Sequence, residues 1–312
     1  MGRFATRQRC AIARQEENVT PPVELAVDAR ASTGESPTWC EREQALYWID
    51  IEEPALHRFN PADNFDEVWE MPAEIGAFAL CRNGTIIVAL RTGLARFDPA
   101  SQALEPLSSA PYNPLALRFN DGKCDARGRF WIGAMNDPLC APDGHSANLA
   151  GPALYAFSHG EGLQDKQVRA VIANGLAWSP DWRTMYFSDS EKGTISVFDF
   201  DIDSAGLSRQ RIFAQFRSSD GKPDGAAVDT EGFYWCALYG GGRIARLAPD
   251  GTMERDIRLP VSQPTMCAFG DVDYSTLYIT SAAHGVTEPQ AGGVFRCRPG
   301  FRGLPTELFA DG

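Results

Sequence analysis

ALYWID at residues 45–50 is followed after a short turn by LHRFNP at residues 56–61, and this pairing of apolar runs returns six times along the chain. The runs that open the six units are ALYWID (45–50), GTIIVAL (84–90), GRFWIG (128–133), TMYFSD (184–189), GFYWCA (232–237) and TLYITS (276–281). Short runs rich in aromatic and β-branched residues, bounded by Gly, Pro or Asp, are typical of strands. The chain is therefore expected to be built from repeated groups of β-strands.

The repeat length indicates how many strands each unit holds. Equivalent positions in the opening runs are Tyr47, Ile86, Phe130, Met185, Tyr234 and Leu277, which are separated by 39, 44, 55, 49 and 43 residues. This spacing suits four short strands per unit, and no long segment shows helical periodicity. We predict an all-β fold, a six-bladed β-propeller. A pair of β-sandwiches is the alternative, but it does not explain six like units.

The ends of the chain bear on how the ring closes. The sixth unit ends close to residue 312, so little sequence is left for an outer strand. Residues 23–27 (VELAV) can supply that strand and remove an open sheet edge. The prediction is a ring closed by an N-terminal strand that completes the last blade. Residues 22–312 then form a single β-propeller domain, and residues 1–21 a disordered N-terminal extension.

Charge and cysteine content narrow the function classes. With 29 Lys and Arg against 41 Asp and Glu, the net charge is −12, which argues against binding to nucleic acid or to an anionic membrane. The eight cysteines include no CxxC pair, and several lie in apolar runs. They are interpreted as reduced, buried side chains of a cytoplasmic protein. A monomer or weak homo-oligomer is expected.

A polar residue precedes the opening run at a shared distance in four units. Glu35 lies 12 residues before Tyr47, Asn120 lies 10 before Phe130, Asn174 lies 11 before Met185 and Asp224 lies 10 before Tyr234. In a propeller this position falls at the start of the innermost strand, so equal phase in different blades means one rim of the central channel. Asn-Gly and Asp-Gly are common turn pairs, and each alone is more often a turn. Four in matched phase favour a site.

Carboxylate and amide oxygens that converge in this way suit a hard divalent cation. Glu35 and Asp224 supply charge, and Asn174 supplies a neutral oxygen. No Cys or His shares the phase, which disfavours a structural zinc site but leaves an open catalytic one. Arg118, two residues before Asn120, points to the same side of an extended segment and can bind substrate hydroxyls. A surface arginine is the alternative.

Other hydrolytic machinery has no support in the sequence. The chain contains no Gly-x-Ser-x-Gly motif, and its four histidines share no phase. The glycine run at 240–242 lacks the Lys-Ser/Thr sequel of a phosphate-binding loop and lies between two expected strands, so it is interpreted as a hairpin.

Together these motifs resemble those of the gluconolactonase and regucalcin (senescence marker protein) family of six-bladed propeller lactonases. The resemblance runs from about residue 35 to residue 295 and rests on GESP (34–37), RFNDGK (118–123), NGLAWS (174–179), PDG (223–225), GGR (241–243) and AGGVF (291–295).

The resemblance implies metal-dependent hydrolysis of a sugar lactone. It implies that Glu35, Asn174 and Asp224 bind one divalent metal ion, which in this family is calcium, zinc, magnesium, manganese or iron. It also implies that Arg118 and Asn120 contact substrate. Some members carry an acidic substrate contact shortly after the opening run of the third unit, and Asp137 is the candidate for that role.

Our hypothesis is hydrolysis of an aldono-1,4- or 1,5-lactone to its aldonic acid, with the metal polarising the carbonyl. Asp224 is the candidate catalytic residue, as a ligand and as the acceptor of a proton from the attacking water. Two alternatives from other classes remain. One is a calcium-binding regulatory propeller without lactone turnover. The other is a non-enzymatic propeller that binds a protein partner across its face.

Overall fold

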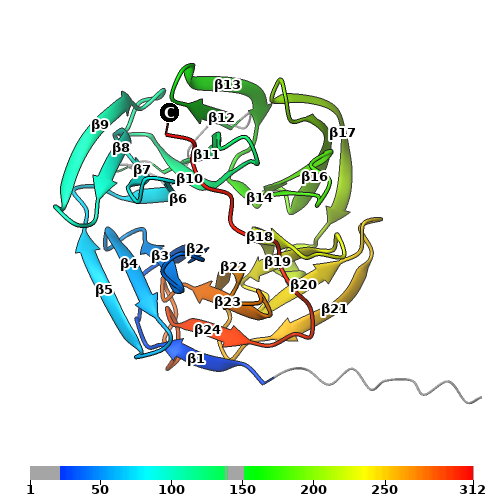
Figure 1. The fold of residues 1–312 in the computed structure, drawn as a ribbon. Coiled ribbons are helices and arrows are strands. Elements are labelled where there is room, and N and C mark those ends of the chain that lie inside the picture. Colours follow the sequence, from blue (N-terminus) through cyan, green and yellow to red (C-terminus); the bar gives the residue numbers. More distant parts are fainter. Residues whose placement is uncertain (1–21, 138, 140–150, 312) are drawn as a thin grey trace, which may run out of the picture.

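The computed structural model describes residues 22–137, 139 and 151–311, and six four-stranded antiparallel sheets form its ring (Figure 1). Each sheet is one blade, and in the first five its strands run outward from the central axis in chain order; in the sixth the outermost strand is the first of the chain. The blades are β2(Gly34–Cys40), β3(Ala45–Asp50), β4(Ala55–Asn60) and β5(Phe65–Glu70); β6(Ile75–Leu80), β7(Ile86–Leu90), β8(Gly93–Asp98) and β9(Ala103–Ser109); β10(Leu117–Cys124), β11(Phe130–Asn136), β12(Ala153–Ser158) and β13(Gly162–Arg169); β14(Ala173–Trp178), β15(Thr184–Asp189), β16(Thr194–Asp201) and β17(Gly206–Gln215); β18(Lys222–Val228), β19(Tyr234–Tyr239), β20(Arg243–Leu247) and β21(Met253–Arg258); and β22(Pro264–Gly270), β23(Thr276–Ser281), β24(Val294–Cys297) and β1(Glu24–Val27). A 3₁₀ turn at Ser218–Asp220 is the single helical element in the described residues.

The predicted propeller is therefore confirmed, and each opening run of the sequence repeat forms the second strand of its blade. Ring closure is confirmed as well, because β1 pairs with β24 and completes the sixth blade. Leu25 lies opposite Phe295 in that pairing. The segment 1–21, predicted to be a disordered extension, lies outside the described residues.

The hydrophobic core lies between consecutive blades. In the first blade every residue of β3 is buried, whereas the outer strand β5 is largely accessible. One cluster joins Tyr47 and Ile49 of the first blade to Phe78 and Val88 of the second, and similar clusters join the blades that follow. Each inner strand thus packs on both faces, which explains why the opening runs are apolar without alternation.

A buried aspartate after the innermost strand ties a blade together. The Asp125 carboxylate accepts hydrogen bonds from the backbone of the following turn, from Arg129 Nε at 2.7 Å and from the Trp131 indole at 2.8 Å. In the fifth blade Asp229 accepts the indole N–H of Trp235 at 2.9 Å. Large indole rings can therefore be buried without leaving a polar atom unpaired.

All six innermost strands carry a β-bulge at the same level. Each strand has one extra residue relative to its partner within the intervals 35–38, 75–77, 120–122, 174–177, 223–226 and 264–266. A bulge breaks the strict alternation of a strand and re-aims its side chains. Here it turns polar side chains toward the axis of a ring whose walls are otherwise apolar.

The central channel has two ends, called here the upper and lower mouths. The upper mouth lies where the innermost strands begin, and the lower mouth lies where they end. The C-terminal segment, residues 303–310, crosses the ring (Figure 1) and spans the lower mouth. Gly303 N–H donates to Tyr274 O at 2.9 Å on the sixth blade, and Phe309 N–H donates to Leu80 O at 2.8 Å on the second.

The state of the cysteines and the presence of membrane-spanning helices can be examined in the described residues. Six cysteines there are free and buried: Cys40, Cys81, Cys124, Cys236, Cys267 and Cys297. No described helix has the length and apolar character needed to cross a membrane.

Candidate functional site at the upper mouth

The four polar residues singled out by their phase lie at the bulge level of four different blades. Glu35 is on β2, Asn120 on β10, Asn174 on β14 and Asp224 on β18, and all four are less than a tenth exposed. Their distances to the reference residues differ because these are not all in one register: Tyr47 lies opposite Thr38 at the edge of the bulge, whereas Phe130 lies two residues farther from it, opposite Cys124. The chain repeat therefore brings them to one level of the upper mouth.

A continuous run of hydrogen bonds links three blades. Arg118 Nη1 donates to Asn120 Oδ1 at 2.7 Å, and Asn120 Nδ2 donates to Asn174 Oδ1 at 2.9 Å. Asn174 Nδ2 donates to the Ser190 hydroxyl at 2.8 Å, and this hydroxyl donates to the carbonyl of Pro223 at 2.6 Å. Asp224 is the next residue. The orientation of each amide is thus fixed by its neighbours, which places the two asparagine oxygens on defined sides of the channel.

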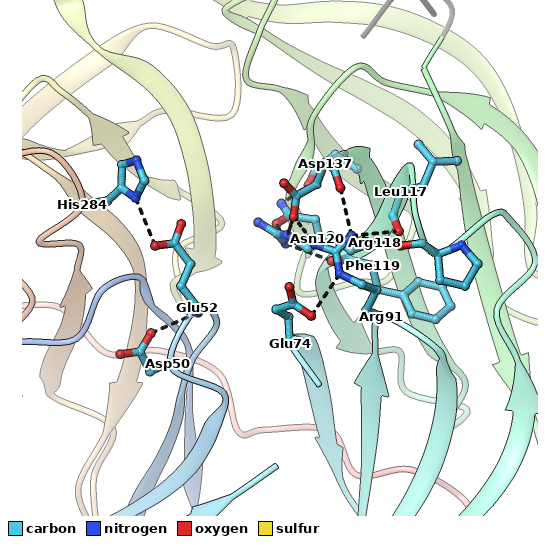
Figure 2. Close-up of polar contacts among 12 residues, drawn as sticks. Asp50, Glu52, Glu74, Arg91, Leu117, Arg118, Phe119, Asn120, Asp137 and His284 are labelled. Carbon is cyan, nitrogen blue, oxygen red and sulfur yellow. Dashed lines mark hydrogen bonds and ion pairs between the residues drawn. The ribbon is translucent and has the colours of Figure 1, made fainter. Parts of the chain in front are cut away.

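Asp137 joins the same network from the end of the third blade. Its Oδ2 accepts from Arg118 Nε at 2.8 Å and from Arg91 Nη2 at 2.5 Å (Figure 2). Arg91 is 4% exposed, and its Nε donates to Glu74 Oε2 at 3.0 Å. The remaining Arg91 donor contacts three backbone carbonyls, including that of Asp137 at 2.9 Å. Arg91 therefore holds Asp137, and Asp137 holds Arg118.

Three carboxylates at this level lack a cationic partner among the described residues: Glu35, Asp121 and Asp224 form no ion pair there within 4.0 Å. Burial, followed by the charge of Asp121, raises the pKa of Glu35 to about 8. Burial raises the pKa of Asp224 well above its ordinary value, and the charges of Glu35 and Asp121 add to the shift. These carboxylates repel one another in a site of low polarity.

The donor set fits a divalent cation. The described residues contain no cluster of three or more His, Cys, Asp and Glu side chains able to hold a metal ion. The set at the upper mouth is of another kind, because an asparagine amide stands between two carboxylates. Asp121 Oδ1 is buried without a hydrogen-bond partner, which marks a shortage of positive charge. Oxygen ligands and unbalanced negative charge are the features that a hard cation satisfies.

Lys123, like Arg118, is a cation whose charge acts on Glu35. Its Nζ donates to the carbonyl of Ala226 at 2.6 Å, across the channel from the third blade to the fifth. Burial lowers the pKa of Lys123, while the charges of Asp121, Cys267 and Glu35 oppose that shift. Lys123 thus balances part of the negative charge from below and braces the two blades.

Residues just past the second strands line the rest of the mouth, and sequence reasoning missed them. They are Glu52 after β3, Arg91 after β7, Tyr239 at the end of β19 and His284 after β23. Glu52, Arg91 and Tyr239 each lie five residues after the reference residue of their opening run, so a comparison of phase at the end of these runs could have found them. His284 lies seven residues after Leu277 and is outside this phase.

Comparison of the sequence with those of known proteins identifies the family of this chain. Residues 33–283 match the family described as the SMP-30/gluconolactonase/LRE-like region. The chain is 38% identical to a 6-deoxy-6-sulfogluconolactonase from Pseudomonas putida, over 89% of this chain and 94% of that protein. It is 36% identical to an L-arabinolactonase from Azospirillum brasilense, over 92% and 95%.

A solved structure agrees with these sequence relatives. The crystal structure of a calcium-binding protein, regucalcin, from Agrobacterium tumefaciens superposes with a TM-score of 0.85 at 25% identity, covering 93% of this chain and 98% of that one. Its fold and extent are those found here. The chain belongs to the SMP-30/gluconolactonase/LRE-like family.

Proposed function

We propose that this protein hydrolyses a sugar lactone, an aldono-1,4- or 1,5-lactone, to the aldonic acid with one divalent metal ion at the upper mouth. One observation carries the proposal: two buried carboxylates without a cationic partner, those of Glu35 and Asp224, lie at the same level as a hydrogen-bonded chain of one arginine and two asparagines. Relatives named for lactone hydrolysis support it.

Glu35, Asn174 and Asp224 are the proposed metal ligands. Asn174 Oδ1 accepts one hydrogen bond, from Asn120, and keeps a second lone pair for a cation. When bound, the cation would polarise the lactone carbonyl and favour the tetrahedral oxyanion. Supplying different divalent metals to chelator-treated protein would identify the ion that the site uses.

Asp224 is the proposed proton acceptor. Its carboxylate has no cationic partner within 4.0 Å among the described residues, so an oxygen not used by the metal can accept a proton from the water that attacks the carbonyl.

Arg118 and Asn120 are proposed to orient the substrate. The Arg118 side chain is fixed by Asp137 and by Asn120, so its remaining donors point in a set direction. Asp137 uses Oδ2 for both arginines and is 37% exposed, which leaves Oδ1 for a substrate hydroxyl. Asp137 therefore combines the proposed substrate contact with a positioning role.

A calcium-binding function without turnover is the second candidate. The solved regucalcin structure is described as that of a calcium-binding protein, and the same carboxylates would serve such a role. The difference between the two candidates lies in what the ordered arginine and asparagine side chains do. Only an enzyme requires them to face a substrate.

The test uses chelator-treated protein supplied in turn with calcium, zinc, magnesium, manganese or iron(II). Hydrolysis of a panel of aldono-1,4- and 1,5-lactones is followed by pH-stat, corrected for the uncatalysed rate. We expect turnover that returns with metal and saturates at one ion per chain. Stoichiometric metal binding without turnover would favour the calcium-binding candidate, and neither binding nor turnover would favour the partner-binding propeller.

The compartment proposed is the cytoplasm. The six free, buried cysteines fit a reducing environment, because no pair among them is bridged.

A further inference from the structure

The wall opposite Arg118 is formed by a pair of side chains from the first and sixth blades. His284 Nδ1 lies 3.0 Å from Glu52 Oε2, and the Ser32 hydroxyl donates to the same carboxylate oxygen. The side chains of Glu52 and His284 are 44% and 63% exposed, so both can meet a ligand. Glu52 is thus an accessible carboxylate held in place by two neighbours.

This pair lies across the mouth from the proposed substrate residues. Figure 2 shows Glu52 and His284 on one side of the mouth and Arg118, Asn120 and Asp137 on the other. Partial burial alone would raise the pKa of Glu52, but hydrogen bonds from Ser32 and His284, with the charge of Arg118, bring it below its ordinary value. Arg118 and Glu52 thus stand on opposite walls of one mouth, on either side of the place proposed for the lactone ring.

The two arginines of the described part of the mouth are held by carboxylates. Arg91 is paired with Glu74 and Asp137, and Arg118 shares Asp137. Both lie on the wall opposite Glu52 (Figure 2). An anionic substituent reaching the far wall would therefore meet the Glu52 carboxylate and the His284 ring that is already hydrogen-bonded to it. A neutral hydroxyl would instead find a hydrogen-bond acceptor.

Building on the proposed function, we propose that Glu52 is a specificity residue, held in place by His284. It accepts a hydrogen bond from the hydroxyl on the carbon farthest from the reacting ester. The protein consequently prefers lactones with a neutral polyol end over those that carry a sulfonate or phosphate there. The 38%-identical relative is named for a lactone that carries a sulfo group at that end, a 6-deoxy-6-sulfogluconolactone.

The experiment compares two substrates that differ at one position: D-glucono-1,5-lactone and its 6-deoxy-6-sulfo counterpart. kcat/KM is measured for both with the metal-loaded wild type, Glu52→Gln, His284→Ala and Glu53→Gln. We expect the wild type to favour the neutral lactone by about tenfold or more, as a like-charge penalty predicts. Glu52→Gln should lower this ratio by a similar factor, chiefly through KM. His284→Ala should lower it less.

Glu53→Gln is the matched control, because it removes the same charge one residue away on an exposed side chain. It should leave the ratio unchanged. Equal turnover of the two lactones by the wild type, or equal effects of Glu52→Gln and Glu53→Gln, would overturn the inference alone. No turnover of either lactone with any metal would overturn the proposed function and the inference with it.

Discussion

The two mouths of the channel are made by the same six strands, yet they differ in chemistry. The upper mouth gathers Glu35, Asn120, Asn174 and Asp224, whose oxygens face the axis. The lower mouth holds a cavity of about 110 Å³ lined largely by apolar side chains, such as Phe78, Trp178 and Phe269, and covered by residues 304–307. One end is polar and is proposed to bind a ligand, whereas the other is closed by the chain itself.

The bulges explain this division. Above them the innermost strands point polar side chains at the axis, and below them the regular alternation returns and small or apolar residues face inward. Lys123 lies at the boundary, with its amine reaching across to Ala226 O. A propeller can thus hold unbalanced charge at one end because the other end and the blade interfaces supply stability.

The largest expected effect follows from removing a carboxylate at the upper mouth. Asp224→Ala should lower kcat/KM on the best lactone by about 10³-fold or more, because it removes a proposed ligand and the proposed base together. The carboxylate at the lower mouth provides the control. Glu307→Gln should leave kcat/KM within about twofold, since Glu307 lines the covered cavity and not the site. Full activity of the Asp224 variant would remove Asp224 from the mechanism.

The sequence predicts the fold well because a propeller repeats one solution six times. Phe130 and Tyr234 occupy the same place in their blades, opposite Cys124 and Val228, and the other opening runs fall on the same strand, so apolar runs alone reveal the period. The closing pairing of β1 with β24 was also accessible, since a sixth unit short of an outer strand needs one from elsewhere. Both the propeller fold and the closing strand can therefore be predicted from the sequence repeat.

The site is only partly predictable by the same reasoning. Glu35, Asn120, Asn174 and Asp224 share a phase, and the structure places them at one level, although their roles stay proposals. The wall residues share no residue type, and His284 lies two residues outside the phase that Glu52, Arg91 and Tyr239 share.

Side-chain pairing across long sequence separations explains the rest of what was missed. Arg91 contacts Asp137 over 46 residues, and Glu52 contacts His284 over 232. No periodicity within a blade indicates such pairs, because they depend on how loops of different length fold over the mouth.

The second expected effect tests the closed end. Phe309 is fully buried and stacks on Phe157 with ring centroids 5.6 Å apart. Phe309→Ala should lower the free energy of unfolding by about 3–5 kcal/mol, through lost burial and a cavity. The kcat/KM of the folded variant at 25 °C should stay within about twofold of wild type, because the upper mouth is untouched. Arg302→Ala, at an exposed position of the same tail, should cost no more than about 0.5 kcal/mol.

Chemical denaturation read by fluorescence measures the stability of both tail variants, and lactone hydrolysis below the transition measures their activity. A Phe309→Ala protein that keeps its stability, or one that loses turnover while still folded, would contradict the separation of the two mouths.

The smallest expected effect is a pH dependence of the metal-free protein. The pKa of Glu35 is raised from 4.5 to about 8 in the folded state, so the folded protein binds its proton more tightly than the unfolded chain. Stability from this group is therefore fully present below pH 4.5 and is lost as the pH rises toward 8. Asp224 acts in the same direction.

The measurement compares melting temperatures of chelated wild type and chelated Glu35→Gln at pH 5.5 and pH 8. Between these pH values the melting temperature of the wild type should fall by a few degrees more than that of Glu35→Gln, whose amide carries no such proton. A bound divalent cation should reverse the loss, with the larger gain in melting temperature at pH 8, because protons and metal compete for the same oxygens. Parallel melting curves for the two chelated proteins across this range would show that Glu35 is already balanced without a metal, and the upper mouth would then differ from the lower one in polarity but not in strain.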